Sequence, residues 1–341
     1  ASTRRRSRPW SARRMQAETL LIFFDAIDTR DNRYQISDSG PPEALSESID
    51  EAGLISLPWV QQREADKAFR VVAGFRRITV CRKLGWPQLT CHVLPADAPK
   101  LSGWKIAIAD NAVTRCLNLL EQARAAAGLM DVCDGDAKQA AQLAGPLGLR
   151  VNPELIGKLT RLLALPGPVQ QAVAQNRMSL NIALNLEMMD ESSAVAFAGL
   201  CQNLKPTVNH QQEIFTGLYE LARLQNKSPA DVLARSDFSK ILHASRTDRR
   251  RQLQALRRTL YNQRFPNLSR SEAAFEQKKN NLGLPENMNI SAPPGFESNV
   301  YTLTVRFSQC RQLCDCAEKL AVICRKPELE DLLDRSFNEN P

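Results

Sequence analysis

The stretch that decides the fold is FRVVAGFRRITVCRKLG, residues 69–85. Its first five residues predict a strand, and Gly74 then turns the chain directly into a helix that we expect to end near Leu84. Such a turn leaves free backbone N–H groups at the helix N-terminus, beside Arg76 and Arg77. The turn is therefore either a phosphate-binding seat or a tight strand-to-helix connection with two solvated arginines.

The residues around this stretch alternate short apolar strands with helices. Further strands are predicted over Leu20–Ile27, Tyr34–Ser37, Pro58–Gln62 and Leu89–Leu94. A helix predicted over Pro42–Ala52 places Leu45 and Ile49 on one face and ends at Gly53, which suits a left-handed C-cap. We therefore expect a small α+β domain over residues 19–100.

Two segments, LSESIDEAGLISLPWV (residues 45–60) and FRVVAGFRRITVCRKLGW (residues 69–86), resemble the N-terminal domain of ParB-type partition proteins. Sulfiredoxin shares this fold. The matching positions are Leu45, Ile49, Gly53, Leu54, Pro58, Val60, Val71, Val72, Gly74, Arg76, Arg77, Leu84 and Gly85. In that family the G-x-R-R turn contacts the triphosphate of CTP. The resemblance thus implies a cytidine-nucleotide pocket that contains Gly74, Arg76 and Arg77.

A second segment, IADNAVTRCLNLLEQARAAAGL (residues 108–129), resembles the family's E-N-x-x-R motif and the helix that follows it. The matching positions are Asn111, Leu117, Asn118, Glu121 and Ala123. The resemblance implies that Asp110, Asn111 and Arg115 approach the nucleotide from the opposite side. Asn111 would contact a Mg²⁺ ion carried by the phosphates, because the protein alone offers no metal site. CTP and Mg²⁺ are the expected cofactors.

Departures from the family pattern bear on hydrolysis. Phe75 stands where the partition proteins usually have Glu, Asp110 replaces the Glu of the second motif, and the arginine expected at Thr114 occurs at Arg115. NRYQIS, residues 32–37, stands in place of the family's arginine-rich motif. We expect binding to survive these changes more readily than hydrolysis, which leaves at most a weak CTPase with Asp110 as the candidate catalytic carboxylate. Sulfiredoxin-like chemistry is disfavoured because the pocket turn has no cysteine.

From Lys105 to about Leu282 nearly every segment has helical periodicity. Helices are predicted over Leu117–Gly128, Ala137–Leu147, Pro153–Leu165, Val169–Gln175, Ser179–Met189, Gln211–Leu224 and Arg249–Tyr261. Within the helical domain expected over residues 101–235, the segment from Lys138 resembles the family's helix-turn-helix, with Asn152 as N-cap of the recognition helix. Candidate DNA contacts are Arg150, Asn152, Lys158 and Arg161. An ordinary helical hairpin remains the alternative, because the turn is long and Glu154 repels phosphate.

A basic helical segment is expected over residues 236–286. Between residues 240 and 270 the sequence has nine basic residues and a single acid, Asp248. The basic residues are Lys240, Arg246, Arg249, Arg250, Arg251, Arg257, Arg258, Arg264 and Arg270. Leu253, Leu256 and Leu260 form the expected buried stripe. The outward arginines, with Arg249, Arg250 and Arg257 as candidates, either contact DNA phosphates or form a solvated face.

A C-terminal strand-helix piece is expected over residues 287–341. A Pro- and Gly-bearing connector, residues 287–298, precedes a strand whose apolar positions begin at Tyr301, and then a helix that ends before Pro327. The cysteines of this helix fall on one continuous stripe with apolar residues: Cys310, Leu313, Cys314, Ala317, Leu320, Ala321 and Cys324. We therefore interpret most of them as core residues rather than metal ligands.

The net charge of +8 arises mainly at the N-terminus. Six arginines precede the first acidic residue, and without them the chain has 39 basic and 37 acidic residues. The segment 1–18 is either a basic arm for DNA phosphate or a stretch ahead of a true start at Met15. No apolar run reaches membrane-spanning length, and nine cysteines without paired spacing suit a reducing compartment. We expect a bacterial cytoplasmic protein.

These patterns together predict a ParB-like DNA-binding protein, regulated by CTP, that acts in DNA partition or related regulation at the nucleoid. Its expected partners are double-stranded DNA, a second copy of the chain and a partner ATPase, with no membrane. Two alternatives stay open. One is a phosphoryl-transfer enzyme or nuclease that uses the same pocket, and the other is a DNA-binding adaptor that has lost the nucleotide.

Overall fold

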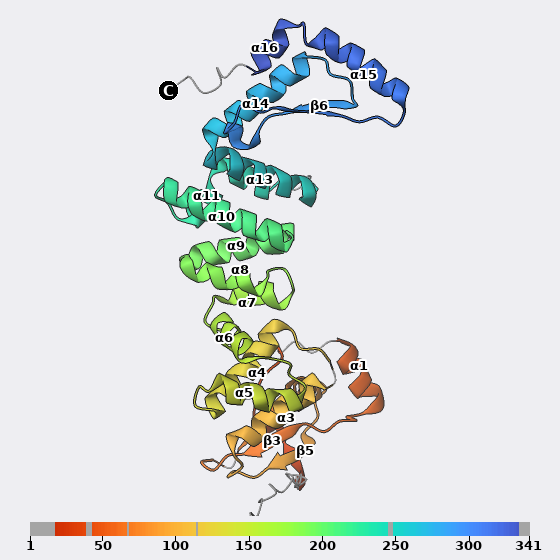
Figure 1. Cartoon of the computed structure of the whole chain (residues 1–341). Helices are drawn as coiled ribbons and strands as arrows, with labels where there is room; N and C mark the ends of the chain where they lie inside the picture. Colours follow the sequence, from red (N-terminus) through yellow and green to blue (C-terminus); the bar gives the residue numbers. More distant parts are fainter. Residues whose placement is uncertain (1–17, 39–42, 67, 114, 245–247, 334–341) are drawn as a thin grey trace, which may run out of the picture. The chain divides into compact units, whose positions relative to one another are not determined.

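The computed structural model describes residues 18–38, 43–66, 68–113, 115–244 and 248–333. The expected N-terminal arm, Met15 and Thr114 therefore lie outside the described residues, apart from Glu18. Contacts divide the chain after Met188 into two compact units (Figure 1). This division falls inside the segment 101–235, so the domain boundaries expected from the sequence stay a prediction.

The first unit begins with a five-stranded mixed sheet. Its strands are β1 (Glu18–Phe23), β2 (Ile27–Asp28), β3 (Trp59–Gln62), β4 (Phe69–Ala73) and β5 (Gln88–Leu94), in the order β1-β5-β3-β4-β2. β1 pairs antiparallel with β5 and β3 with β4, whereas β3 with β5 and β2 with β4 are parallel. β4 ends at Ala73, directly before the turn at Gly74 that leads into a helix.

The strand predicted over Tyr34–Ser37 is wrong, because these residues form an irregular segment. Tyr34 and Ile36 are nevertheless almost fully buried. The ring of Tyr34 packs edge-on against Trp104 at 5.3 Å between centroids, and a Cβ at Gly103 would lie 2.5 Å from it. The alternation of apolar residues thus comes from a loop that is buried against a helix. A strand would show the same alternation, so the pattern alone does not distinguish the two.

Two helices cover the sheet as expected. They are α1 (Glu43–Ala52), which Gly53 follows in the left-handed conformation, and α2 (Phe75–Lys83). Val60, Val71 and Ile78 are fully buried between sheet and helices. This core fixes the position of the β4–α2 turn.

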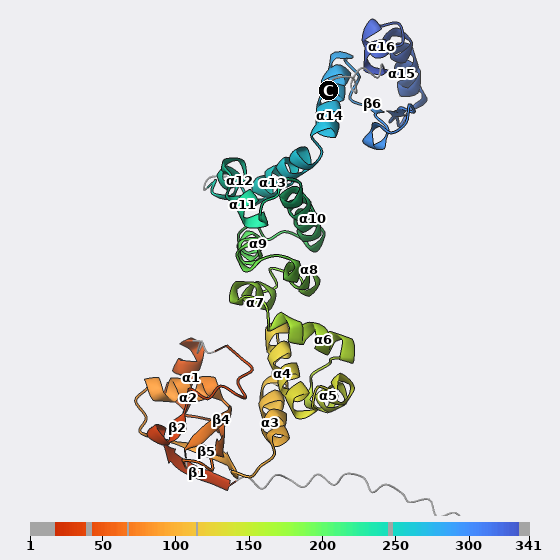
Figure 2. The ribbon, with the colours of Figure 1, turned by 90° about the vertical axis from the view of Figure 1, so that its left-hand side faces the viewer.

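The rest of the first unit is helical: α3 (Lys100–Ala112), α4 (Leu119–Val132), α5 (Ala137–Ala144), α6 (Pro153–Leu162), α7 (Gly167–Ala174) and α8 (Leu180–Asn185). α4 is the central helix, since it contacts α3, α5, α6 and α7 (Figure 2). A Cβ at Gly128 of α4 would lie 2.2 Å from the ring of Trp104 on α3, so only glycine allows these two helices their close approach. The sheet, α3 and the helical pair α5–α6 are thereby joined through α4.

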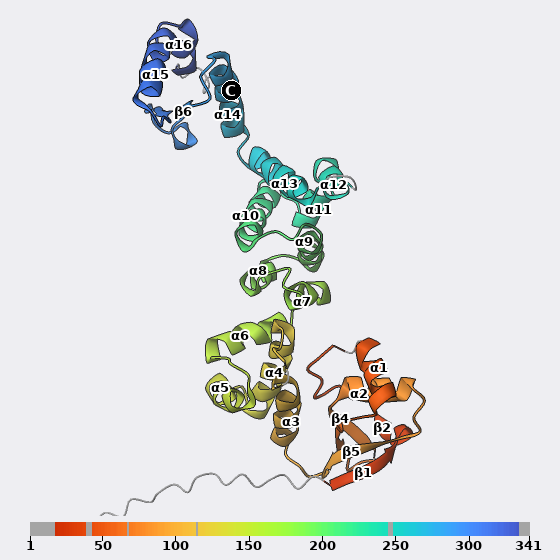
Figure 3. The same ribbon diagram turned by 90° about the vertical axis from the view of Figure 1, so that its right-hand side faces the viewer.

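The second unit consists of α9 (Glu191–Leu204), α10 (Val208–Leu224), α11 (Pro229–Ala234), α12 (Ser236–Leu242), α13 (Arg249–Arg264) and α14 (Pro266–Asn281), followed by a small sheet and two helices (Figure 3). α13 packs along α10. The expected buried stripe of α13 is confirmed at Leu256 and Leu260, while Leu253 is half-buried. No helix within the described residues is long and apolar enough to cross a membrane.

The C-terminal piece contains β6 (Met288–Ser291), β7 (Thr302–Val305), α15 (Cys310–Ile323) and α16 (Pro327–Leu333). The predicted strand after Tyr301 and the helix before Pro327 are confirmed. The expected connector is wrong in part, because β6 forms within it and pairs antiparallel with β7. This piece shares a hydrophobic core with α14. The core consists of Phe275, Leu282, Ile290, Ile323 and Leu332.

The prediction that the cysteine stripe of α15 is core is also wrong. Cys310, Cys314 and Cys324 are exposed, and α15 instead buries Cys316 and Ile323. The periodicity identified an amphipathic helix, but the side of α15 that meets the core carries Cys316 and Ile323, which the predicted stripe omits. All nine cysteines are free, and no group of three or more metal-binding side chains converges in the described parts of the chain.

Candidate functional site

The β4–α2 turn is held in a conformation that requires glycine. Gly74 has φ +88°, and a Cβ there would lie 2.8 Å from the Cβ of Pro58 and 3.0 Å from Nε of Arg77. Both the left-handed backbone and the lack of space exclude a side chain. The turn therefore lies close against the loop that precedes β3, with the N-terminus of α2 facing a cavity.

That cavity has a volume of about 390 Å³, a size at which small-molecule sites are common. It is lined by Ile36, Ser37, Leu45, Ser56, Gly74, Phe75, Arg76, Arg77, Asp110, Asn111 and Arg115. The structure thus brings together, from the β4–α2 turn and from α3 and the residues just after it, all the residues that sequence analysis proposed for the nucleotide pocket. Whether they bind a nucleotide stays a prediction.

Arg77 connects three segments of the pocket wall. Its Nη2 donates to both carboxylate oxygens of Asp110, at 2.9 and 2.7 Å. Its Nη1 donates to the backbone oxygen and to Oγ of Ser56, at 3.0 and 2.6 Å. The side chain is only 15% exposed, so this ion pair is better shielded from water than a surface pair. Arg77 thereby ties α2 to α3, the helix that leads to α4.

Arg115 is held by a second carboxylate. Its two terminal nitrogens donate to the two oxygens of Glu121, at 2.7 and 2.6 Å, and Nη2 also donates to Oγ of Ser37 at 2.5 Å. Ser37 in turn donates to Oδ1 of Asn111 at 2.9 Å. Glu121 also closes a capping box with Asn118 at the start of α4. One network thus links the irregular segment before α1, α3 and α4.

The charge state of Glu121 follows from these partners. Burial by itself would raise the pKa of this carboxyl group, but the hydrogen bonds from Arg115, from the Asn118 backbone and from Ser37, with the charge of Arg115, lower it below its ordinary value of 4.5. The hydrogen bond to Glu121 likewise raises the pKa of Arg115. The pair is therefore ionised at neutral pH.

Arg76 differs from these two arginines. Its Nε is buried and has no hydrogen-bond partner among the described residues. A buried donor without a partner is costly, and such atoms in a cavity indicate a missing acceptor. Phe75, at the usual place of a glutamate, packs instead against the core of the sheet domain. Gly74 and Arg76 thus offer a phosphate group close backbone approach and an available donor.

A bound metal ion fits the pocket less well than a phosphate does. Asp110 accepts from Arg77 with both oxygens, and Oδ1 of Asn111 accepts from Ser37. Nδ2 of Asn111 donates to the backbone oxygen of Ala107 at 2.9 Å. These oxygen atoms thus already accept hydrogen bonds within the protein, and a Mg²⁺ ion would compete with those donors for them.

The predicted helix-turn-helix has its expected helices in α5 and α6. Oδ1 of Asn152 caps α6 by accepting from the Leu155 backbone N–H at 2.7 Å, which confirms the N-cap. Arg150 and Asn152 are exposed. Lys158 forms an ion pair with Glu154 at 2.8 Å. Arg161 donates to both oxygens of Glu187, so two of the four candidate DNA contacts already have acidic partners.

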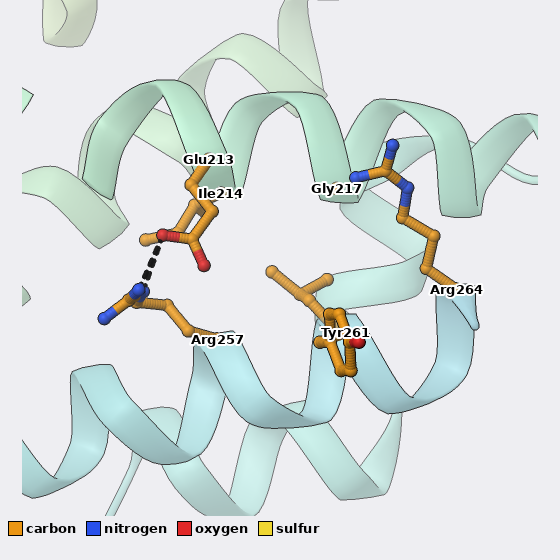
Figure 4. Close-up of a pocket in the computed structure, with 7 residues that line it drawn as sticks. Glu213, Ile214, Gly217, Arg257, Tyr261 and Arg264 are labelled. Carbon is orange, nitrogen blue, oxygen red and sulfur yellow. Dashed lines mark hydrogen bonds and ion pairs between the residues drawn. The ribbon is translucent and has the colours of Figure 1, made fainter. Parts of the chain in front are cut away.

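The basic residues of α13 separate into two kinds. Arg257 pairs with Glu213 at 2.8 Å across the interface with α10 (Figure 4). Arg264 pairs with Glu220 across the same interface. A small cavity of about 40 Å³ lies between these pairs, next to Gly217. Arg249 and Arg250, by contrast, are exposed and form no ion pair within the described residues. The charges of Arg249 and Arg250 are therefore available to an anionic ligand.

Sequence analysis missed three residues of the pocket and its supporting network. Ser37 was assigned to a strand, and nothing in the sequence marks Ser56. Glu121 was quoted only as a position of resemblance, although its place three residues after Asn118 is the signature of a capping box. That spacing could have placed Glu121 at the start of α4, but not opposite Arg115.

No protein-family model matches the chain. It is similar to a nucleoid occlusion protein of Lysinibacillus sphaericus (strain C3-41), with 28% identity over 165 residues that cover 48% of this chain and 52% of the relative. It is also similar to a probable chromosome-partitioning protein ParB of Treponema pallidum (strain Nichols), with 31% identity over 137 residues that cover 40% of each. The chain thus spans about half the length, or less, of these curated relatives.

Among solved structures, a C-terminally truncated chromosome-partitioning protein ParB from Caulobacter crescentus, complexed with CTP-gamma-S, shares 20% identity. The match covers 54% of this chain and 98% of the other, with a TM-score of 0.25. By sequence, the chain is thus similar to partition and nucleoid occlusion proteins of the ParB type over less than half of its own length.

Proposed function

We propose that this protein is a DNA-binding protein regulated by CTP, acting in DNA partition or a related regulatory process. The observation that carries the proposal is the cavity that gathers Gly74, Arg76 and Arg77 opposite Asp110 and Asn111. In ParB-type proteins the corresponding turn contacts the triphosphate of CTP, and here the same turn retains a glycine-dependent close approach and an unsatisfied arginine donor.

The phosphate groups would bind at Gly74 and Arg76. A triphosphate next to Arg77 competes with Asp110 for the guanidinium group, because both are anions within one partly buried site. Release of Asp110 would loosen the connection between α2 and α3. Since α3 contacts α4, and α4 contacts α5 and α6, binding in the pocket reaches the helix-turn-helix through packed helices.

Binding rather than hydrolysis is the proposed role of the pocket. Asp110 is the only carboxylate that lines the described cavity, and Arg77 occupies both of its oxygens. Phe75 offers no carboxylate. Asp110 stays the candidate for a weak CTPase, and Mg²⁺ would accompany the triphosphate rather than occupy a site built by the protein.

Double-stranded DNA is the proposed macromolecular partner. Arg150 and Asn152 are exposed at the start of α6 and are available to DNA, whereas Lys158 and Arg161 must exchange their acidic partners for phosphate. Such an exchange is feasible because exposed ion pairs are weak. The proposed location is accordingly the cytoplasm, at the nucleoid, and a partner ATPase belongs to the same proposal.

A second copy of the chain is the other proposed partner. α15 exposes Leu313 and Val322, and Leu303 of β7 and Phe307 are exposed in the same piece. Large apolar side chains exposed on one small piece favour association. Deletion of residues 299–341 should therefore convert a dimer into a monomer in light scattering, and an unchanged mass would exclude this surface as the dimer contact.

The function is tested by calorimetric titration of the full chain with CTP, ATP and ADP in the presence of Mg²⁺, with and without duplex DNA. Selective binding of CTP that DNA strengthens would support the proposal. Absence of binding for all three nucleotides would contradict it and leave a nucleotide-free adaptor.

Arg76→Ala and Arg77→Ala locate the binding site within the pocket. Both should abolish CTP binding, the first by loss of a phosphate donor and the second also by loss of the connection to Asp110. Arg82→Ala is a matched control on the same helix, since Arg82 bonds Thr29 and the backbone of Phe24 away from the cavity. CTP affinity equal to that of the unmodified protein in both pocket variants would place the nucleotide elsewhere.

A further inference from the structure

The second unit contains a groove that neither the nucleotide pocket nor the helix-turn-helix uses. It lies between the turn that joins α9 to α10 and the first turns of α13. Its volume is about 580 Å³, and the charged and titratable residues that line it are Lys205, His210, Asp248, Arg249, Arg250 and Arg257. Two regions far apart in the sequence thus supply cations to one concave surface.

The charges of this groove do not cancel. Asp248 is the only acid among the described residues that line the groove, and Glu213 beside the groove is paired with Arg257. Four cations therefore oppose two carboxylates. Arg249 and Arg250, both exposed, have no ion-pair partner among the residues described. Figure 4 shows Arg257 held by Glu213 at the neighbouring end of the α10–α13 interface.

His210 adds an independent polar feature. Its Nδ1 is buried and has no hydrogen-bond partner in the described part of the chain. Its backbone N–H is already taken, because it donates to Oγ1 of Thr207, the N-cap of α10. Buried polar atoms normally have a partner, so this ring nitrogen is a polar atom of a residue in the groove wall for which the described residues supply no partner.

We propose that this groove binds backbone phosphates of duplex DNA, as a contact separate from the helix-turn-helix. The inference rests on the proposed function, which supplies DNA as the partner. Its lining has no Phe, Tyr or Trp on which an unpaired base could stack, and its exposed arginines suit a charged backbone rather than base edges. The contact is expected to be independent of DNA sequence.

The test measures how DNA affinity depends on salt concentration. The full chain is titrated into a fluorescent duplex of arbitrary sequence at several salt concentrations, by anisotropy. Each phosphate that a cation neutralises contributes about 0.9 to the slope of log affinity against log salt concentration. The double variant Arg249→Ala/Arg250→Ala should therefore lower the slope by about 2.

Arg251→Ala/Arg258→Ala is the matched control. Both residues are exposed on α13, and the double change removes the same charge, but neither residue lines the groove. Lys205→Asn tests the opposite wall, since Asn tolerates the left-handed backbone of Lys205 (φ +49°). It should lower the slope by about 1.

Different failures have different meanings. If the unmodified protein binds duplex and the groove variants keep its slope, or the control lowers the slope equally, the groove is not a phosphate contact. If polyglutamate competes as well as duplex at equal charge, the groove takes an acidic protein instead and the inference is overturned. If the unmodified protein binds no duplex at all, the proposed function itself fails.

Discussion

The pocket beside Gly74 and the groove beside Lys205 are both lined by arginines, but these arginines differ in whether they form ion pairs. In the pocket, Asp110 accepts from Arg77 and Glu121 accepts from Arg115, each with both carboxylate oxygens, and Glu121 is only 5% exposed. In the groove, Arg249 and Arg250 are exposed and have no acidic partner among the residues that the structure describes. Neutralised, shielded arginines brace a structure, while exposed ones attract counter-ions that DNA can displace.

The comparison teaches that arginine count alone does not identify an anion site. Arg76 is the pocket residue with an unsatisfied donor, and the two braced arginines act through their connections to α3 and α4. Ligand binding in the pocket is therefore expected to be coupled to these ion pairs, whereas Arg249 and Arg250 of the groove can bind an anion without breaking an ion pair between described residues. The four changes that follow test this difference, from the largest expected effect to the smallest.

Gly74→Ala should have the largest effect. A Cβ would add a clash with Pro58 to the cost of a left-handed backbone, so we expect a loss of stability of about 3 kcal/mol and no CTP binding. Gly85→Ala is the control, since Gly85 has φ +77° and open space around it. It should cost only about 1 kcal/mol in urea unfolding. Equal losses for the two variants would show that the close approach at Gly74 is not tight.

Glu121→Gln should weaken the bracing of the pocket. The change leaves Arg115 without its ionic partner, and we expect a loss of about 2 kcal/mol, below the value for a fully buried pair because Arg115 is 37% exposed. Urea unfolding at neutral pH measures it.

The same variant has a pH signature. Because the folded-state pKa of Glu121 lies below its ordinary value of 4.5, its contribution to stability is present above pH 4.5 and is lost as pH falls through the folded-state pKa. The unmodified protein should lose this stability on acidification, and Glu121→Gln should lack that part of the loss. Parallel pH profiles for the two proteins would contradict the assignment.

Asp110→Asn should strengthen anion binding in the pocket. Removal of the negative charge frees Arg77, and CTP affinity measured in EDTA should rise by roughly fivefold, or about 1 kcal/mol. Any hydrolysis should disappear. Asp131→Asn removes the same charge from an exposed pair with Lys100 and should leave the affinity unchanged. A lower affinity of the Asp110 variant would mean that this carboxylate helps to hold the ligand.

Glu213→Gln should have the smallest effect and concerns the groove. Loss of this half-exposed pair should cost about 0.5 kcal/mol in stability and make Arg257 available, which steepens the salt dependence of DNA binding. Glu220→Gln is the control, since its partner Arg264 does not line the groove. The same steepening in both variants would indicate a general effect of net charge.

Much of this fold could be predicted because its signals are local. The strand at residues 69–73, the helix after Gly74 and the caps at Gly53 and Asn152 each follow from hydrophobic period or cap chemistry within a few residues. The pocket residues could be grouped only through resemblance to a known family, since Arg77 and Asp110 are far apart in the sequence.

By itself the sequence determined the strands at residues 69–73 and 89–94, most of the helices, the glycine turn and the identity of the cations. Tertiary structure alone decided which arginines are neutralised, because an ion pair such as Arg115–Glu121 or Arg257–Glu213 depends on how helices pack. It also decided that Tyr34 lies in a buried loop and that α15 exposes its cysteines. Local patterns report which side chains prefer burial, whereas the packed fold has room for only some of them.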